Sequence, residues 1–159
     1  MNRGFEKISQ EQWNKDCKNG YQKYYDNVII PQRKTSHSAG YDFFSPFDFT
    51  LGAGEDIKVP TGIKSYMEED EFLSIYPRSS LAFKYYLRLA NNVAVIDCDY
   101  YNNKDNDGHI FIKIKNEGLS EINITMGMSF AQGIFQKYYL IDGDNYNGDQ
   151  RIGGIGSTT

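Results

Sequence analysis

Cysteine is scarce in this sequence, which has two cysteines among its 159 residues. Cys17 and Cys98 lie far apart and form no C-x-x-C pair. The two cysteines therefore indicate neither a disulfide framework nor a zinc site. We expect both thiols to be reduced, as they are in a cytoplasmic protein.

Long apolar runs are also absent. The sequence has no stretch of 18 successive apolar residues, which argues against a membrane-spanning helix. The first ten residues, MNRGFEKISQ, lack the apolar run of a signal peptide. We therefore expect a soluble, cytoplasmic protein without a membrane partner.

Basic residues are not in excess. The chain has 17 Lys and Arg against 21 Asp and Glu, and its formal net charge is -4. Binding to a nucleic-acid backbone usually requires a basic face, and here the basic residues are scattered. We expect no nucleic-acid partner. A small phosphorylated ligand is compatible with the sequence, because a metal ion and a few Arg side chains can supply positive charge locally.

The apolar residues that are present predict one all-β domain. Hydrophobic residues make up 40% of the chain, enough for one core of ordinary size, and the 13 tyrosines favour strands. Apolar residues alternate at Ile57–Val59, Ile110–Ile114 and Ile122–Met126, and Phe72–Tyr76 is a compact apolar run. These segments predict strands with a buried face. Turn signals such as Gly52, Gly54, Gly62, Gly118 and Gly127 separate short apolar segments, which is typical of an antiparallel sandwich, jelly roll or barrel.

Three segments depart from this pattern. Residues 9–18 predict one short N-terminal helix, because Ser9 suits the N-cap and Gly20 can end the helix. The stretch Asn102–Gly108 is polar and rich in turn residues, which predicts a loop. The tail from Gly143 onward has four glycines in its last fourteen residues and predicts a flexible arm.

Five short stretches combine a turn with polar groups that a strand-rich core does not require. In chain order they are Ser38–Asp42 (SAGYD), Pro77–Ala82 (PRSSLA), Ala94–Tyr100 (AVIDCDY), Ala131–Gly133 (AQG) and Arg151–Thr158 (RIGGIGST). Taken singly, each stretch also fits a structural role: a turn cap, a helix N-cap at Ser79 or Ser80, an Asp-rich turn, core packing or a disordered tail.

Their chemistry suggests a phosphate-handling site. Asp42 suits the water shell of a magnesium ion, which keeps several waters and needs few protein ligands. Arg78, with the hydroxyls and backbone N–H groups that follow it, suits phosphate oxygens. Asp97 directly follows an apolar strand, where a carboxylate can act as a general base that positions water.

In this order the five stretches resemble the five motifs of the trimeric dUTPase family (deoxyuridine 5'-triphosphate nucleotidohydrolases), from about Ile30 to the C-terminus. The family's A-G-Y-D, P-R-S-S/G-L-A and V-I-D-x-D-Y motifs match Ala39–Asp42, Pro77–Ala82 and Val95–Tyr100 almost letter for letter. The resemblance implies a jelly-roll-like β-barrel. It divides the chain into an N-terminal helical extension (1–26), the dUTPase core (27–142) and a flexible C-terminal arm (143–159).

The resemblance also implies the activity. Relatives hydrolyse dUTP to dUMP and pyrophosphate with Mg²⁺ as cofactor, which removes dUTP from the nucleotide pool and supplies dUMP for thymidylate synthesis. They are homotrimers whose sites are shared between subunits. Phosphate hydrolysis suits such a site, because it depends mainly on positioning, charge neutralisation and exclusion of water.

Residue roles follow from the resemblance position by position. Asp97 orients the attacking water, Tyr100 packs under the deoxyribose and excludes a 2'-hydroxyl, and Asp42 holds hydrated magnesium. Asn91 matches a position that reads the uracil edge in some relatives. The remaining substrate-binding residues implied are Arg78, Ser79, Ser80 and Gln132 in the core, with Arg151, Ile155, Gly156 and Ser157 in the arm, where Arg151 clamps the terminal phosphate.

Two departures from the motifs stand out. Ile155 occupies the position where the family usually has a Phe that stacks on uracil, which implies weaker stacking and a poorer closed state of the arm. Ala94 replaces a common Gly at the start of the third motif.

Two alternatives stay open. A dCTP deaminase of the same fold is one, although the strand Ile112–Asn116 lacks the Glu that such enzymes use. The other is a dUTP-responsive regulator with a protein partner of unknown identity, for which the N-terminal aromatics Trp13, Tyr21, Tyr24 and Tyr25 offer a surface. We favour packing of these aromatics against the barrel.

Overall fold

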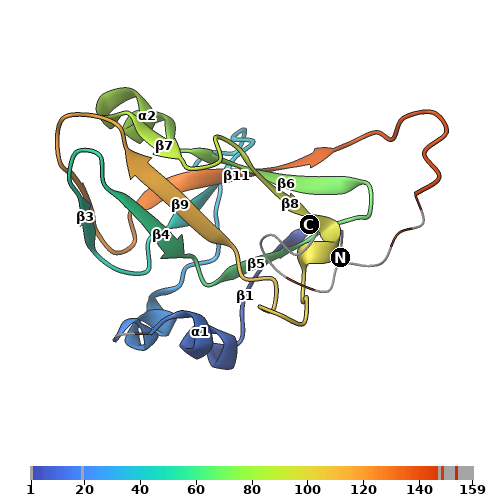
Figure 1. The fold of residues 1–159 in the computed structure, drawn as a ribbon, viewed down its shortest axis with the longest axis horizontal. Coiled ribbons are helices and arrows are strands. Elements are labelled where there is room, and N and C mark those ends of the chain that lie inside the picture. The colour runs from blue at the N-terminus through green and yellow to red at the C-terminus, as the bar shows by residue number, and fades with distance from the viewer. Residues whose placement is uncertain (1, 19, 147, 149–152, 154–159) are drawn as a thin grey trace.

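A computed structural model describes residues 2–18, 20–146, 148 and 153, and Figure 1 shows its fold. Short strands dominate, as the sequence predicted. In chain order the elements are β1 (Gly4–Lys7), α1 (Gln10–Asp16), the 3₁₀ helix η1 (Tyr21–Asn27), β2 (Tyr41–Phe44), β3 (Phe49–Leu51), β4 (Asp56–Pro60), β5 (Ile63–Tyr66), β6 (Glu71–Pro77), α2 (Ser79–Tyr85), β7 (Leu87–Leu89), β8 (Ala94–Asp97), the 3₁₀ helix η2 (Cys98–Tyr100), β9 (Phe111–Asn116), β10 (Ile122–Ile124) and β11 (Ser129–Lys137).

The described strands form four antiparallel sheets. The largest has the order β2-β11-β6-β8 and the next has the order β4-β9-β7, while β1 pairs with β5 and β3 with β10. The all-β fold is confirmed, but these strands do not close into one barrel, because β2 and β8 are left as edges of the largest sheet. The two α-helices lie on opposite sides of the strands (Figure 1).

The alternating pattern places one face of each predicted strand in the core. In β9, Ile112 and Ile114 are buried while Lys113 and Lys115 are exposed. Strand β10 has the same alternation but ends at Ile124, so Met126 lies beyond it and is exposed. Burial of such side chains supplies the main stabilising free energy of the fold.

The N-terminal segment packs against the rest of the fold, although Tyr21 stays 40% exposed. The Ser9 hydroxyl caps α1 as predicted, accepting the Gln12 N–H at 3.2 Å. Trp13 is 0% exposed, and the Tyr21 ring stacks edge-on against Phe47 with 4.7 Å between centroids. The helix ends before Gly20, at Asp16, and η1 follows it.

Strand β1 was not predicted from the sequence. It pairs with β5 over four residues, from Gly4 opposite Tyr66 to Lys7 opposite Ile63. Within the described part of the chain, no helix is both long and apolar enough to cross a membrane.

Candidate active site

Strand β11 brings three of the predicted motifs together. It lies between β2 and β6 in the largest sheet, and Gln132 is opposite Asp42 on β2 and opposite Tyr76 on β6. Because directly opposed residues in antiparallel strands lie close together, this register places the first, second and fourth motifs side by side.

A pocket of about 260 Å³ opens where these motifs meet. Its lining contains Asp42, Arg78, Ser79, Ser80 and Gln132, five of the residues that the sequence predicted for the site, together with Lys34, Ser38 and Gly40. The pocket therefore combines two cations, one carboxylate, three hydroxyls and an amide. Such a set of donors and charges matches the oxygens of a phosphate chain and its counterion.

Gly40 lies directly against the side chain of Gln132. A Cβ atom at Gly40 would overlap the Oε1 atom of Gln132. The other end of that amide, Nε2, lies 3.5 Å from the carbonyl oxygen of Pro77. The glycine of the first motif thus makes room for the glutamine of the fourth, which in turn reaches back to the second.

The second motif is held by β11 while its hydroxyls stay exposed. The Arg78 N–H donates to the Phe130 carbonyl at 3.3 Å, and its Nη1 lies 3.5 Å from the Ser129 carbonyl. Arg78, and neither serine, is the N-cap of α2, so the helix-capping alternative for Ser79 and Ser80 is wrong. Both serine side chains are exposed and available to a ligand.

Asp42 lines this pocket with its carboxylate unpaired among the described residues. Among the described residues, none donates a hydrogen bond to this half-buried carboxylate or forms an ion pair with it. The described residues also contain no cluster of three or more His, Cys, Asp or Glu that could enclose a metal ion. A single carboxylate fits magnesium, which keeps several waters and is shared with substrate phosphates.

Lys34 and Ser38 were not predicted as pocket residues. Ser38 precedes the first motif directly, and Lys34 lies in the polar stretch RKTSHS before it. Two adjacent basic residues just ahead of a turn motif were the available signal. Their position at the pocket depends on how the chain enters β2, where Gln32 and Asp42 exchange backbone hydrogen bonds.

The third motif lies elsewhere on the chain. Asn91 is in the turn between β7 and β8 and lines a separate, mainly apolar hollow of about 290 Å³. Asp97 ends β8 with an exposed side chain, and Tyr100 in η2 is only 4% exposed. Burial, and then the charges of Asp99 and Asp97, raise the pKa of the Cys98 thiol, so it is protonated at neutral pH and not a nucleophile.

Strand β6 separates the two groups of residues. Asp97 is opposite Phe72, near the start of β6, whereas Arg78 directly follows its last residue, Pro77. Six residues of extended strand span about 20 Å. A single chain therefore does not bring Asp97 to the pocket of Arg78. The predicted arm residues Arg151, Ile155, Gly156 and Ser157 lie outside the described residues.

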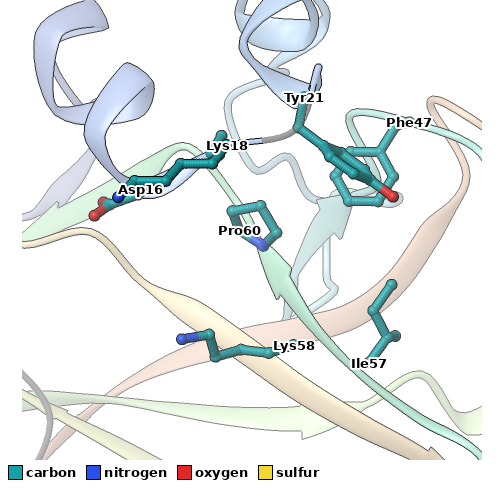
Figure 2. Close-up of a pocket in the computed structure, with 8 residues that line it drawn as sticks. Asp16, Lys18, Tyr21, Phe47, Ile57, Lys58 and Pro60 are labelled. Carbon is teal, nitrogen blue, oxygen red and sulfur yellow. The ribbon is translucent and has the colours of Figure 1, made fainter.

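A larger pocket, of about 370 Å³, contains none of the predicted site residues (Figure 2). It lies between the N-terminal segment and β4, with Lys18 and Tyr21 on one side and Lys58 on the other. Burial raises the pKa of the neighbouring Cys17 thiol to about 12. Size alone thus does not single out the predicted site.

Comparison with known proteins identifies the same family as the motifs. The dUTPase family model matches residues 26–159. The deoxyuridine 5'-triphosphate nucleotidohydrolase of Lactococcus lactis is 45% identical over 132 residues, 82% of this chain and 88% of the relative. The chain belongs to the dUTPase family. Its first 25 residues, with β1 and α1, precede the part that the family model matches.

Other dUTPases extend the likeness. The swinepox virus dUTPase is 36% identical over 115 residues, 72% of this chain and 75% of the relative. The crystal structure of the Streptococcus mutans dUTPase, 40% identical, has a TM-score of 0.70 and covers 88% of this chain and 99% of its own. The dUTPase of phage phi11 of S. aureus shares the fold at 17% identity, with a TM-score of 0.68 over 94% of this chain and 99% of its own.

Proposed function

We propose that this protein hydrolyses dUTP to dUMP and pyrophosphate. Membership of the dUTPase family supports this activity, and so do the names of relatives up to 45% identical. The observation that carries the proposal is the 260 Å³ pocket in which β11 assembles residues of three family motifs. The products require that water attacks the α-phosphorus, that the bond between the α-phosphorus and the bridging oxygen breaks, and that pyrophosphate leaves.

The pocket of Arg78 holds the phosphates in this proposal. The guanidinium donates to phosphate oxygens, and the exposed hydroxyls of Ser79 and Ser80 donate beside it. The Gln132 amide supplies a further donor, and Lys34 adds positive charge at the rim. These groups stabilise charge that shifts to the leaving pyrophosphate in the transition state.

Magnesium fits this pocket as a cofactor held through water. Asp42 is the protein group that would hold the hydrated ion, because its carboxylate has no protein partner among the described residues. When bound, magnesium supplies positive charge to the phosphate oxygens. A structure of the phage phi11 dUTPase, 17% identical to this chain, concerns the coordination of a structural Mg(II) ion in that protein.

The third motif completes the site. Asp97, exposed at the end of β8, orients the attacking water and accepts its proton. Asn91, in the turn before β8, reads the uracil edge from its hollow. Tyr100 packs against the deoxyribose and leaves no room for a 2'-hydroxyl. The arm residues, led by Arg151, close over the phosphates.

The distance between Asp97 and Arg78 favours a shared site. Asp97 lies opposite Phe72 near one end of β6 and Arg78 follows the other end, about 20 Å away in one chain. The reaction, however, needs water and phosphate in contact. A closed symmetric assembly solves this by placing Asp97 of one subunit against the pocket of another. We propose a homotrimer, with sites shared between subunits.

The activity is tested by pyrophosphate release from dUTP, dCTP, dTTP and UTP with magnesium. We expect release from dUTP alone, lost in Asp97→Asn and kept in the control Asp26→Asn, whose exposed carboxylate lies on η1. Ammonia release from dCTP would instead support a deaminase. A folded wild-type protein that leaves dUTP intact would contradict the proposal.

Subunit sharing has a separate test. Asp97→Asn and Arg78→Ala are each expected to be inactive alone, so the two are unfolded together and refolded as a mixture. If each site takes these residues from different chains, about a quarter of the sites regain both native residues in a random mixture. A mixture as inactive as its components would show that one chain supplies both residues.

A further inference from the structure

The segment that follows the third motif is a packed structure rather than an open loop. Asn103 and Asn106 are 7% and 9% exposed, although the sequence around them is polar. The backbone turns sharply, with positive φ at Asn102, Asp107 and Gly108. A Cβ atom at Gly108 would lie 2.9 Å from backbone atoms, so the chain passes itself closely there. Buried amides in such a place require hydrogen-bond partners.

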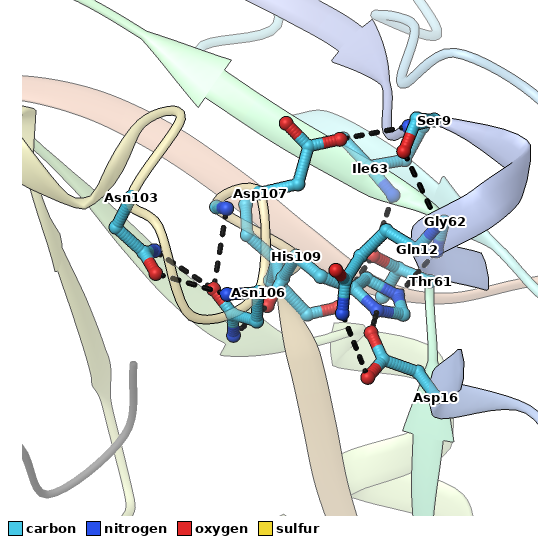
Figure 3. Close-up of polar contacts among 12 residues, drawn as sticks. Ser9, Gln12, Asp16, Thr61, Gly62, Ile63, Asn103, Asn106, Asp107 and His109 are labelled. Atoms are coloured by element: carbon cyan, nitrogen blue, oxygen red, sulfur yellow. Dashed lines mark hydrogen bonds and ion pairs between the residues drawn. The ribbon is translucent and has the colours of Figure 1, made fainter. Parts of the chain in front are cut away.

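Two of those partners are atoms of Tyr100, the last residue of the third motif. Asn103 Nδ2 donates to the Tyr100 carbonyl at 2.8 Å and to Asn106 Oδ1 at 2.7 Å. Asn106 Nδ2 in turn donates to the Tyr100 hydroxyl at 2.7 Å. Figure 3 shows Asn103 and Asn106 joined across the bend of this segment. The two asparagines thus hold the backbone and the side-chain end of the same tyrosine.

The Tyr100 hydroxyl both donates and accepts a hydrogen bond. It donates to the His109 carbonyl at 2.8 Å and accepts from Asn106. A phenol has one proton to donate, so this hydroxyl has no donor left for a ligand. The ring is fixed at its far end and is 4% exposed.

The segment is also anchored on its outer side. The Asp107 carboxylate accepts the Ser9 N–H at 2.8 Å and pairs with Lys64 at 2.9 Å. His109 Nδ1 lies 2.6 Å from the Asp16 carboxylate of α1 (Figure 3). The bend is therefore braced against the N-terminal helix and β5, and cannot relax without breaking these contacts.

We propose that Asn106 is a positioning residue for Tyr100 and sets the discrimination between dUTP and UTP. The proposal rests on the function proposed above, in which the Tyr100 ring packs against the sugar. A hydrophobic pocket rejects an isosteric analogue that carries an added hydroxyl by only about 100-fold. Stronger rejection of a 2'-hydroxyl requires a ring that cannot move aside, and Asn106 holds the hydroxyl end of that ring.

The test compares kcat/KM for dUTP and UTP in wild type, Asn106→Ala, Tyr100→Phe and the double variant. We expect Asn106→Ala to lower the dUTP/UTP ratio about tenfold, mainly by raising kcat/KM for UTP. Tyr100→Phe removes the same hydrogen bond from its other side, so the double variant is expected to match Tyr100→Phe alone. Lys104→Ala, an exposed change in the same segment, keeps the wild-type ratio.

Two results would overturn the proposal. One is an unchanged ratio in Asn106→Ala, and the other is a double variant whose loss is the product of the single losses, as for a general loosening of the fold. If Asn106→Ala does not fold, Tyr100→Phe decides, because an unchanged ratio there refutes the role of the bond. A wild type without dUTPase activity would refute the proposed function itself, and this inference with it.

Discussion

Acidification is expected to destabilise the protein through His109. The imidazole is 0% exposed, with Nε2 accepting the Gly62 N–H at 3.0 Å and Nδ1 bonded to the Asp16 carboxylate at 2.6 Å. Protonation at Nε2 removes the acceptor for Gly62 and places a charge in the core. Burial lowers the pKa of His109, and the hydrogen bond to Asp16 opposes this only in part.

The sign and size of the effect follow from linkage. Because the folded pKa of His109 lies below its ordinary value of 6.5, the unfolded chain binds the proton first as pH falls. The stabilising contribution is complete above about pH 6.5 and is lost below it, by at most about 1.4 kcal/mol per pH unit. Between pH 7.5 and 5.5 this amounts to at most about 1.4 kcal/mol, or roughly 4 °C in Tm.

Thermal unfolding at pH 7.5, 6.5 and 5.5 measures this effect. The carboxyl groups of Asp16 and Asp107 have lowered pKa values, so they titrate below this range. The chain has one other histidine, His37, which is exposed. We expect His37→Gln to keep the decline in Tm and His109→Gln to lose it, with a lower Tm throughout. A wild type equally stable at pH 7.5 and 5.5, or a decline that disappears in His37→Gln, would refute the reasoning.

Three further predictions concern the pocket and the core. Gly40→Ala should lower kcat/KM for dUTP at least about tenfold, because its Cβ would displace the Gln132 amide in the pocket; Gly52→Ala, whose Cβ would meet Glu55 outside the pocket, serves as control. Trp13→Ala should cost about 3–5 kcal/mol in urea unfolding, and the exposed change Asn14→Ala less than about 0.5 kcal/mol; equal effects would show that the N-terminal segment is not part of the core. Asp42→Asn should raise the magnesium concentration for half-maximal activity about tenfold or more, and an unchanged requirement would remove Asp42 from the metal site.

Strands with strong alternation were predictable from the sequence. The pattern of β9, with Ile112 and Ile114 inward, depends only on neighbouring residues and on burial of one face. Strand β1 has four residues, GFEK, and no clear period. Its existence depends on pairing with β5, some sixty residues away in sequence, and nothing local encodes such a partner.

In the candidate site, too, some features were predictable from the sequence and others were not. Motifs named the pocket residues Asp42, Arg78 and Gln132, because their chemistry is readable from residue type and order. The packed segment after Tyr100 was predicted only as a loop, since its residues are polar. Buried asparagines look like turn asparagines in a sequence, and only their three-dimensional hydrogen-bond partners separate the two cases.

The position of the third motif relative to the pocket was also not predictable from the order of the motifs in the chain. Asp97 follows Arg78 by nineteen residues, a separation short enough to suggest one local site. After Arg78 the chain passes through α2 and β7 and then forms β8, which runs antiparallel to β6 beside it. Each residue of β8 therefore lies farther from Arg78 than the one before it. Asp97, the last residue of β8, is therefore the farthest. In the proposed mechanism a second chain supplies Asp97 to the pocket of Arg78. Activity should therefore disappear on dilution below the dissociation constant of the assembly, while each subunit keeps its pocket.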